Sequence, residues 1–207
     1  MTEINGVKSI MFVGPKSPIG PAKLHHIDLW TGKLRWSREL EDRPVFQQSP
    51  LVTQHQVLVV VKDKRGLGLI ALSRETGEVL WEQAPGLVAT TTAWLTVDDT
   101  VIANSASGTL LCIECETGRL RYNHVFSRHV ESEQPRRLEP VLRNGALFVP
   151  QHQVHVVRPR DGELIGTVPS DLIPDLLRVD ERCDVYLAEE SGHVAAFGAA
   201  PKLTLVK

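Results

Sequence analysis

A nine-residue signature occurs four times along the 207 residues of this chain. Each copy has a Thr-Gly or Asp-Gly turn at its centre, and three of the four end in an aromatic residue. The copies are Asp28–Trp36, Ser73–Trp81, Glu114–Tyr122 and Arg158–Gly166. Their glycines follow one another at intervals of 45, 41 and 44 residues. A period in this range indicates stacked supersecondary units and is typical of β-propeller blades.

Two apolar columns precede each turn. Residues 24, 69, 110 and 154 are Leu, Leu, Leu and Val, and residues 27, 72, 113 and 157 are Ile, Leu, Ile and Val. Side chains three residues apart on a strand point to opposite faces of the sheet. Both faces of this strand are therefore apolar, which predicts a sheet covered on both sides by neighbouring sheets.

The turn residues divide each repeat into a four-stranded antiparallel meander. In the second repeat we expect strands at 50–53, 57–61, 69–72 and 79–81, with a turn over 64–68. The third repeat predicts strands at 93–97, 100–103, 109–113 and 120–122, and the fourth at 140–142, 146–150, 154–157 and 164–168.

The two ends of the chain depart from this pattern. The first repeat starts at its second strand, 9–13, with its inner strand missing or minimal; a fifth repeat has strands at 176–179, 184–188 and 194–197, lacks the signature, and offers 203–206 as an outer strand. We predict an all-β fold, a small β-propeller of about five four-stranded antiparallel blades with degenerate terminal blades, in one domain over residues 1–207. Because exposed edge strands and apolar sheets associate, such a propeller is either a closed ring or an open arc completed by another chain or a second copy.

The charges of the chain exclude several classes of partner. The 23 basic and 25 acidic residues are well mixed and give a net charge of −2, so no broad basic surface is available for nucleic acid or anionic lipid. The chain shows no basic leader and no stretch of 18 apolar residues, and its three cysteines cannot all pair with one another. We expect a cytoplasmic protein with reduced thiols that binds neither membrane nor nucleic acid.

The signature resembles the tryptophan-docking motif Ala-x-Asp-x-x-Thr-Gly-Lys-x-x-Trp of the quinoprotein alcohol-dehydrogenase-like propellers. This repeat occurs in pyrroloquinoline-quinone (PQQ) enzymes and in an outer-membrane assembly scaffold lipoprotein. The first copy differs from the motif only at His26, whereas Tyr122 and Gly166 stand at the tryptophan place of the third and fourth copies, which we interpret as decay. The resemblance spans residues 10–197 and implies the propeller fold. It also implies inter-blade packing for Trp36 and Trp81, whose indoles can cover a broad area.

The PQQ enzymes of the family that this chain resembles have eight blades, a disulfide between adjacent cysteines, a calcium ion held by acidic and amide side chains, and an aspartate base. This chain has about half the blades and no adjacent cysteines. We therefore expect no enzyme and no cofactor, and a remnant of a PQQ-dependent dehydrogenase is the least favoured interpretation.

No metal site or other catalytic motif is predicted. Cys112 and Cys115 have the spacing of a zinc knuckle, but residues three apart on a strand face opposite ways and no second pair completes a tetrahedron. Cys112 is expected to be a small core residue. His152 and His155 are separated in the same way, one near a hairpin tip and the other on the returning strand.

Function is expected on the loops, because packing occupies the strands. Three segments are longer than the repeat requires: 14–21, 127–139 and 169–174. The candidate partner-binding residues are Pro15, Pro18, Arg128, His129, Arg136 and Arg137. We predict a protein–protein interaction module, a scaffold or subunit of a larger cytoplasmic assembly, with a homo-oligomer possible if the ring is incomplete. The alternative is a sensor of a small ligand or carbohydrate bound in the channel.

Overall fold

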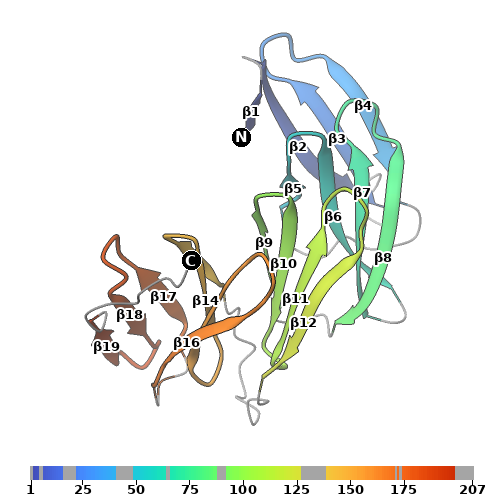
Figure 1. Cartoon of the computed structure of the whole chain (residues 1–207). Helices are drawn as coiled ribbons and strands as arrows, with labels where there is room; N and C mark the ends of the chain where they lie inside the picture. Colours follow the sequence, from blue (N-terminus) through green and yellow to red (C-terminus); the bar gives the residue numbers. More distant parts are fainter. Residues whose placement is uncertain are drawn as a thin grey trace. The chain divides into compact units, whose positions relative to one another are not determined.

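The computed structural model describes residues 2–4, 7–15, 22–40, 49–63, 66–87, 92–126, 139–170, 172 and 174–198 (Figure 1). All regular structure in these ranges is β-strand, which confirms the all-β prediction. The described part of the chain contains no helix long and apolar enough to cross a membrane.

The strands form five antiparallel meanders, each ordered as in the sequence. The first sheet contains β1 (Thr2–Ile4), β2 (Val7–Pro15), β3 (Ala22–Asp28) and β4 (Leu34–Glu39). The second contains β5 (Leu51–Val52), β6 (Gln56–Asp63), β7 (Gly66–Ser73) and β8 (Val79–Leu87). The third contains β9 (Thr92–Val97), β10 (Thr100–Ser105), β11 (Thr109–Glu114) and β12 (Leu120–Val125).

The fourth sheet contains β13 (Val141–Arg143), β14 (Ala146–Pro150), β15 (Val154–Val157) and β16 (Leu164–Val168). The fifth contains β17 (Leu176–Val179), β18 (Val185–Ala188) and β19 (Val194–Phe197). Four-stranded antiparallel sheets are therefore confirmed. The outer strand expected at 203–206 lies outside the described residues.

Many strand boundaries differ from the prediction, most of them because the observed strand is longer. The first sheet has the minimal inner strand that was one of the expected alternatives, β1, which pairs with β2 over three residues. Pro15 pairs with Ala22, so the backbone ladder includes Gly14 and Pro15, which had been assigned to a loop. Asp63 pairs with Gly66, so residues 66–68 of the predicted 64–68 turn belong to β7 instead. In each case the ladder satisfies backbone N–H and C=O groups that a longer loop would leave to water.

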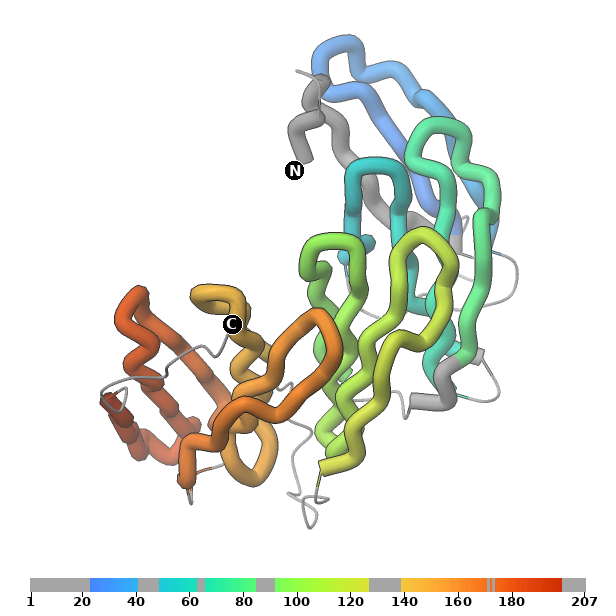
Figure 2. The backbone as a smooth tube through the Cα atoms, viewed as in Figure 1, coloured from blue at the N-terminus to red at the C-terminus, as the bar shows by residue number. Residues whose placement is uncertain are grey.

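The chain, whose backbone is traced in Figure 2, divides into two compact units. The first comprises residues 1–89 and the turn 115–119, and the second comprises residues 90–114 and 120–207. The single domain over 1–207 stays a prediction.

Each unit has cores built from facing sheets. In the first unit, Leu24 of β3 and Trp36 of β4 pack against apolar residues of the second sheet, namely Val57, Val59, Val61, Ile70 and Leu72. In the second unit, Leu110 and Cys112 pack against Leu147, Val149 and Val157. The fourth sheet packs in turn on Leu177, Val179, Val185 and Leu187 of the fifth.

The two-sided burial predicted for the third strand is confirmed in the second and third sheets. Leu69 and Leu72 of β7 are both 0% exposed, and Leu110 and Ile113 of β11 are 0% and 2% exposed. In the first sheet Leu24 is buried, but Ile27 on the opposite face is only half-buried.

Candidate functional site

The four signature turns share one backbone geometry. Gly32, Gly77, Gly118 and Gly162 have φ angles of 66°, 74°, 71° and 78°. This is the left-handed region that favours glycine. The N–H of Gly32 donates to the carbonyl of Asp28 at 2.8 Å, and that of Gly77 donates to Ser73 at the same distance. The local sequence thus sets a tight, preformed turn.

A β-bulge follows each turn at the same place in the outer strand. His26 pairs with Trp36, but Ile27 pairs with Leu34, so Arg35 has no partner opposite it. Leu80, Arg121 and Ile165 are skipped in the same way in β8, β12 and β16. A bulge re-aims the side chains beside it, and the residue that follows each bulge is the aromatic place of the signature.

The two tryptophans at this place lie over the next signature turn. The Trp36 indole donates a hydrogen bond from Nε1 to the Arg74 carbonyl at 2.9 Å, and that of Trp81 donates to the Cys115 carbonyl at 2.7 Å. A Cβ added at Gly77 would lie 2.6 Å from Trp36 Cε3, and one at Gly118 would lie 2.7 Å from Trp81 Cδ2. Glycine is therefore required twice, by its φ angle and by the indole ring.

Tyr122 occupies the same position over the fourth turn, so the interpretation of this residue as a decayed contact is wrong. A Cβ at Gly162 would lie 2.7 Å from Tyr122 Cγ. Nε2 of His124, two residues along β12, hydrogen-bonds the Gly162 carbonyl at 2.5 Å. Only Gly166, at the aromatic place of β16, lacks a ring. The six-membered phenol ring covers the turn, and the neighbouring histidine provides the polar contact.

The first signature turn differs from the other three. Apart from its two neighbours in the chain, no described residue has an atom within 4 Å of a Cβ built at Gly32. Leu29 and Trp30 in the same turn are 40% and 71% exposed. The turn is folded like the others, but no ring of the described residues covers its glycine.

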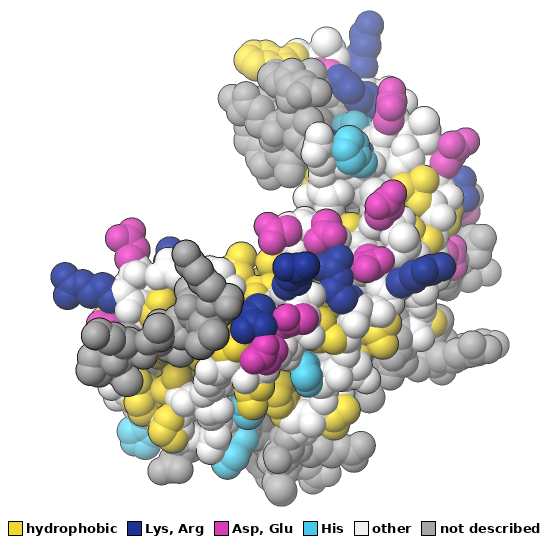
Figure 3. Space-filling model, viewed as in Figure 1, with side chains coloured by type: hydrophobic (Ala, Val, Ile, Leu, Met, Phe, Trp, Pro, Cys, Tyr) yellow, Lys and Arg dark blue, Asp and Glu magenta, His cyan; other side chains and the backbone are white. Residues whose placement is uncertain are grey.

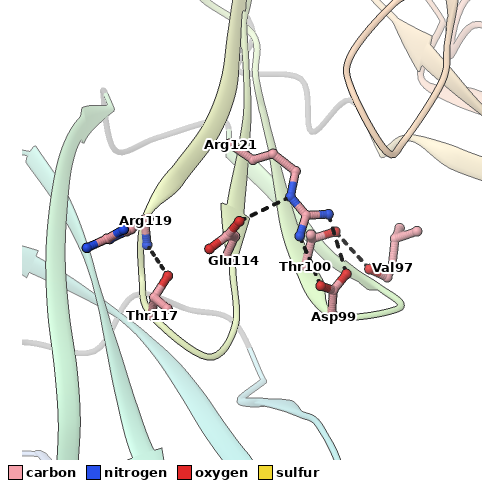
Figure 4. A network of polar contacts seen from close by, with 7 residues as sticks. All are labelled: Val97, Asp99, Thr100, Glu114, Thr117, Arg119 and Arg121. Atoms are coloured by element: carbon pink, nitrogen blue, oxygen red, sulfur yellow. Dashed lines mark hydrogen bonds and ion pairs between the residues drawn. The ribbon is translucent and has the colours of Figure 1, made fainter.

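Arg121, the bulge residue of β12, joins two acidic side chains of the third sheet (Figure 4). Its Nη2 lies 2.9 Å from Oδ2 of Asp99, and its Nε lies 3.5 Å from Oε1 of Glu114. The hydrogen bond from this guanidinium lowers the pKa of the Asp99 carboxyl below its ordinary value. Arg35 makes the corresponding contact with Asp28 at 2.6 Å in the first sheet.

Two hollows of ligand size occur within the second unit. One, of about 460 Å³, is lined by Val97, Asp98, Asp99, Thr100, Arg121, Pro159 and Arg160. The other, of about 450 Å³, lies beside β13 and β17 and is lined by Glu139, Pro140, Val141, Leu142, Pro150, Pro174, Asp175, Leu176, Leu177 and Arg178. Neither lining includes an aromatic side chain. Figure 3 shows basic and acidic side chains interspersed on the face that it draws, as the mixed sequence charge predicts.

The structure describes the backbone of only one of the sequence-predicted partner residues. Pro15 is the last residue of β2. The other candidates, Pro18, Arg128, His129, Arg136 and Arg137, lie outside the described residues. Their role in binding stays a prediction.

The cysteines and histidines have structural positions. Cys112 is 0% exposed in the core of β11, as predicted, and burial raises the pKa of its thiol. Cys115 is buried in the turn that follows β11. The His155 ring stacks on Phe126 with centroids 4.1 Å apart, and burial lowers its pKa. His152 is exposed in the turn after β14.

These residues do not fit a PQQ site. The sequence has no adjacent cysteines that could form the disulfide beside the cofactor. In the part of the chain that the structure describes, no three His, Cys, Asp or Glu side chains are grouped so that they could hold a metal ion.

A buried polar contact that the sequence analysis missed joins the third and fourth sheets. Gln151 Nε2 donates to Asn104 Oδ1 at 2.6 Å and to the Ser105 carbonyl at 3.1 Å, while Asn104 Nδ2 donates to the Pro150 carbonyl at 3.2 Å. Asn104 and Gln151 are both 0% exposed. Their separation of 47 residues leaves no local signal from which this pair could be predicted.

Solved structures place the fold among propellers. A comparison with curated protein sequences finds no match. BamB from Moraxella catarrhalis is similar with a TM-score of 0.68 and 18% identity, over 94% of this chain and 59% of that one. The computationally designed Ika8 protein has a TM-score of 0.63 and 14% identity, over 90% and 57% of the two chains. Quinohemoprotein alcohol dehydrogenase ADHIIG from Pseudomonas putida HK5 has a TM-score of 0.62 and 14% identity, over 96% and 41%.

The chain thus spans less than two thirds of the length of each of these proteins. At such identities the likeness shows the fold alone. The match to a family model is more specific: the model described as outer membrane protein assembly factor BamB matches residues 8–197. The chain belongs to this family of PQQ-repeat β-propellers.

Proposed function

We propose that this protein is a non-enzymatic interaction module, a scaffold or subunit of a larger cytoplasmic assembly, that presents the surface of its sheets and loops to a protein partner. One observation carries the proposal. The signature tryptophans, which in a ligand-binding propeller could form a platform, have their indole N–H groups bound to the Arg74 and Cys115 carbonyls. The repeat residues thus build the fold, and binding is left to the surface.

The comparisons support this choice over an enzyme. The family model that covers residues 8–197 is described as an assembly factor. The residues of this chain do not provide the paired cysteines that the PQQ enzymes need.

A sensor of a small ligand is the second candidate, and the hollow beside β13 and β17 favours it. Its volume of about 450 Å³ lies within the usual size of ligand sites, about 300–1,000 Å³. Against this function, the lining contains three prolines and no aromatic side chain on which a sugar could stack.

The experiment that separates the two functions is purification of the tagged chain from its native host at natural expression, followed by mass spectrometry. A stoichiometric protein partner in the cytoplasmic fraction is the expected result. A partnerless monomer whose melting temperature rises with a sugar, a quinone or a metal ion would support the sensor, since a ligand that binds the folded form stabilises it.

A further inference from the structure

A hollow of about 460 Å³ in the second unit lies beside the fourth signature turn, which is covered by a phenol ring instead of an indole. Pro159 lines this hollow and stands at the place of Arg74 and Cys115, whose carbonyls accept hydrogen bonds from the indoles. Tyr122 has one ring where the tryptophans have two, and no group of the described residues donates to the Pro159 carbonyl. A backbone acceptor is thus left beside the hollow.

One wall of the hollow is held in shape by contacts within the third sheet (Figure 4). Arg121 lies with Nη2 2.9 Å from Asp99 Oδ2 and with Nε 3.5 Å from Glu114 Oε1. The Thr100 hydroxyl donates to the Val97 carbonyl at 2.7 Å. Because the charge of Arg121 is balanced by carboxylates of its own sheet, this residue shapes the hollow and leaves the selection of a ligand to other side chains.

Two charged residues of the lining, Asp98 and Arg160, are free to bind a ligand. Asp98 lies in the turn between β9 and β10, and Arg160 lies in the fourth signature turn. Both residues are exposed, and neither side chain makes an ion pair or a hydrogen bond with any described residue. The hollow therefore offers one unpaired carboxylate and one unpaired guanidinium, which come from different sheets and do not pair with each other.

These two charges select the class of ligand. A simple anion such as phosphate is repelled by the Asp98 carboxylate, and a simple cation is repelled by the Arg160 guanidinium. A metal ion is disfavoured as well, because the described residues contain no group of three side chains that could hold one. A ligand that carries both charges satisfies both residues.

The size and the remaining walls of the hollow agree with a small zwitterion. Its volume of about 460 Å³ lies within the usual range of ligand sites, about 300–1,000 Å³. An ammonium group has several N–H donors for acceptors such as the Asp98 carboxylate and the Pro159 carbonyl, and a guanidinium such as that of Arg160 binds a carboxylate through two parallel hydrogen bonds. Val97 and Pro159 add apolar surface for a side chain.

We propose that the hollow between Asp98 and Arg160 is a binding site for a free α-amino acid with an apolar side chain. The ammonium group of the ligand donates to the Asp98 carboxylate and the Pro159 carbonyl. Its carboxylate accepts hydrogen bonds from Arg160, and its side chain contacts Val97. This site goes beyond the proposed function as an interaction module and does not depend on the protein partner.

The test titrates the full ¹⁵N-labelled chain with L-alanine and with L-leucine and follows the amide signals by NMR. The signals of Asp98 and Arg160 are expected to shift with the concentration of the amino acid, while that of Gly192, which does not line the hollow, stays in place. Isoamylamine is leucine without its carboxylate, and isocaproate is leucine without its amine. Each is expected to bind about tenfold more weakly than leucine or worse, because each loses a charge-assisted hydrogen bond.

Matched variants identify the two binding residues. Asp98 has a φ of 50°, which Asn also tolerates, so Asp98→Asn removes the charge and keeps the turn. Asp98→Asn and Arg160→Gln are each expected to weaken leucine binding by about tenfold or more. Arg182→Gln removes an exposed charge of the fifth sheet and is expected to leave the binding unchanged.

The proposal is overturned if the signals of Asp98 and Arg160 stay in place with both amino acids, or if isoamylamine or isocaproate binds as tightly as leucine. It is also overturned if Asp98→Asn and Arg160→Gln bind leucine as well as the unchanged chain does. Because both residues are exposed, the other signals of the variants should match those of the unchanged chain and show that they are folded. A partnerless chain from the native host would contradict the proposed function instead, so the two failures are distinct.

Discussion

Alanine at Gly77 and at Gly32 should have different effects on stability, although the two turns have nearly the same backbone. The φ angles are 74° and 66°. A side chain in this left-handed conformation costs about 1–2 kcal/mol. At Gly32 a new Cβ meets none of the described atoms, so Gly32→Ala should lower the free energy of unfolding by that amount alone.

At Gly77 the same methyl group would lie 2.6 Å from the Trp36 ring, which must move. Overpacking of this kind costs about 1–3 kcal/mol. Loss of the indole hydrogen bond to the Arg74 carbonyl adds about 0.5–1.5 kcal/mol. Gly77→Ala should therefore lower the free energy of unfolding by about 3–5 kcal/mol in equilibrium urea unfolding followed by circular dichroism.

The Trp36→Ala background tests whether the ring is the cause. There the additional effect of Gly77→Ala should fall to about 1–2 kcal/mol, the cost of the φ angle, because residues in contact are not additive. Trp36→Ala by itself should cost about 2–4 kcal/mol, below the range for fully buried aromatics, because the ring is only half-buried. Equal losses for Gly77→Ala and Gly32→Ala, or an unchanged effect in the Trp36→Ala background, would refute the reasoning.

Three further predictions concern the second unit. Burial lowers the pKa of His155 below 6.5, so the folded protein favours the neutral ring and the free energy of unfolding should fall as the pH drops below 6.5. His155→Phe should flatten this part of a curve of stability against pH. An unchanged slope would contradict the prediction. Gln151→Leu removes a buried donor to Asn104 and should lower the free energy of unfolding by about 1–3 kcal/mol, with a smaller combined loss in the double variant Asn104→Leu/Gln151→Leu than the sum of the singles. Arg121→Met should raise the pKa of Asp99 toward 3.8 in an NMR titration. The stability should change by less than about 1 kcal/mol, because the Asp99 carboxylate is exposed to solvent. An unmoved Asp99 pKa would contradict the ion pair.

The repeat made most of the fold predictable. Thr-Gly and Asp-Gly pairs specify turns by local chemistry, and the apolar columns fix which strands are sandwiched. Strands such as Ala146–Pro150, Val154–Val157 and Leu164–Val168 were therefore predicted to the residue.

What the sequence could not predict depends on geometry between distant residues. The bulge that skips Arg35 and Arg121 is a matter of register, which no single residue type signals. The interpretation of Tyr122 as decay was wrong because it considered only the loss of the indole. The phenol ring of Tyr122 and the imidazole of His124 together cover Gly162. That no described ring lies over Gly32 has no signal in the sequence, where its turn matches the family motif better than any other copy does.

The most direct test of the aromatic contacts is hydrogen exchange of the indole N–H groups by NMR, with signals assigned through Trp36→Phe and Trp81→Phe. Because these two groups donate to the Arg74 and Cys115 carbonyls, they should exchange many times more slowly than in the urea-unfolded chain. Indole exchange as fast as in the unfolded chain would contradict the docking of each ring on the next turn.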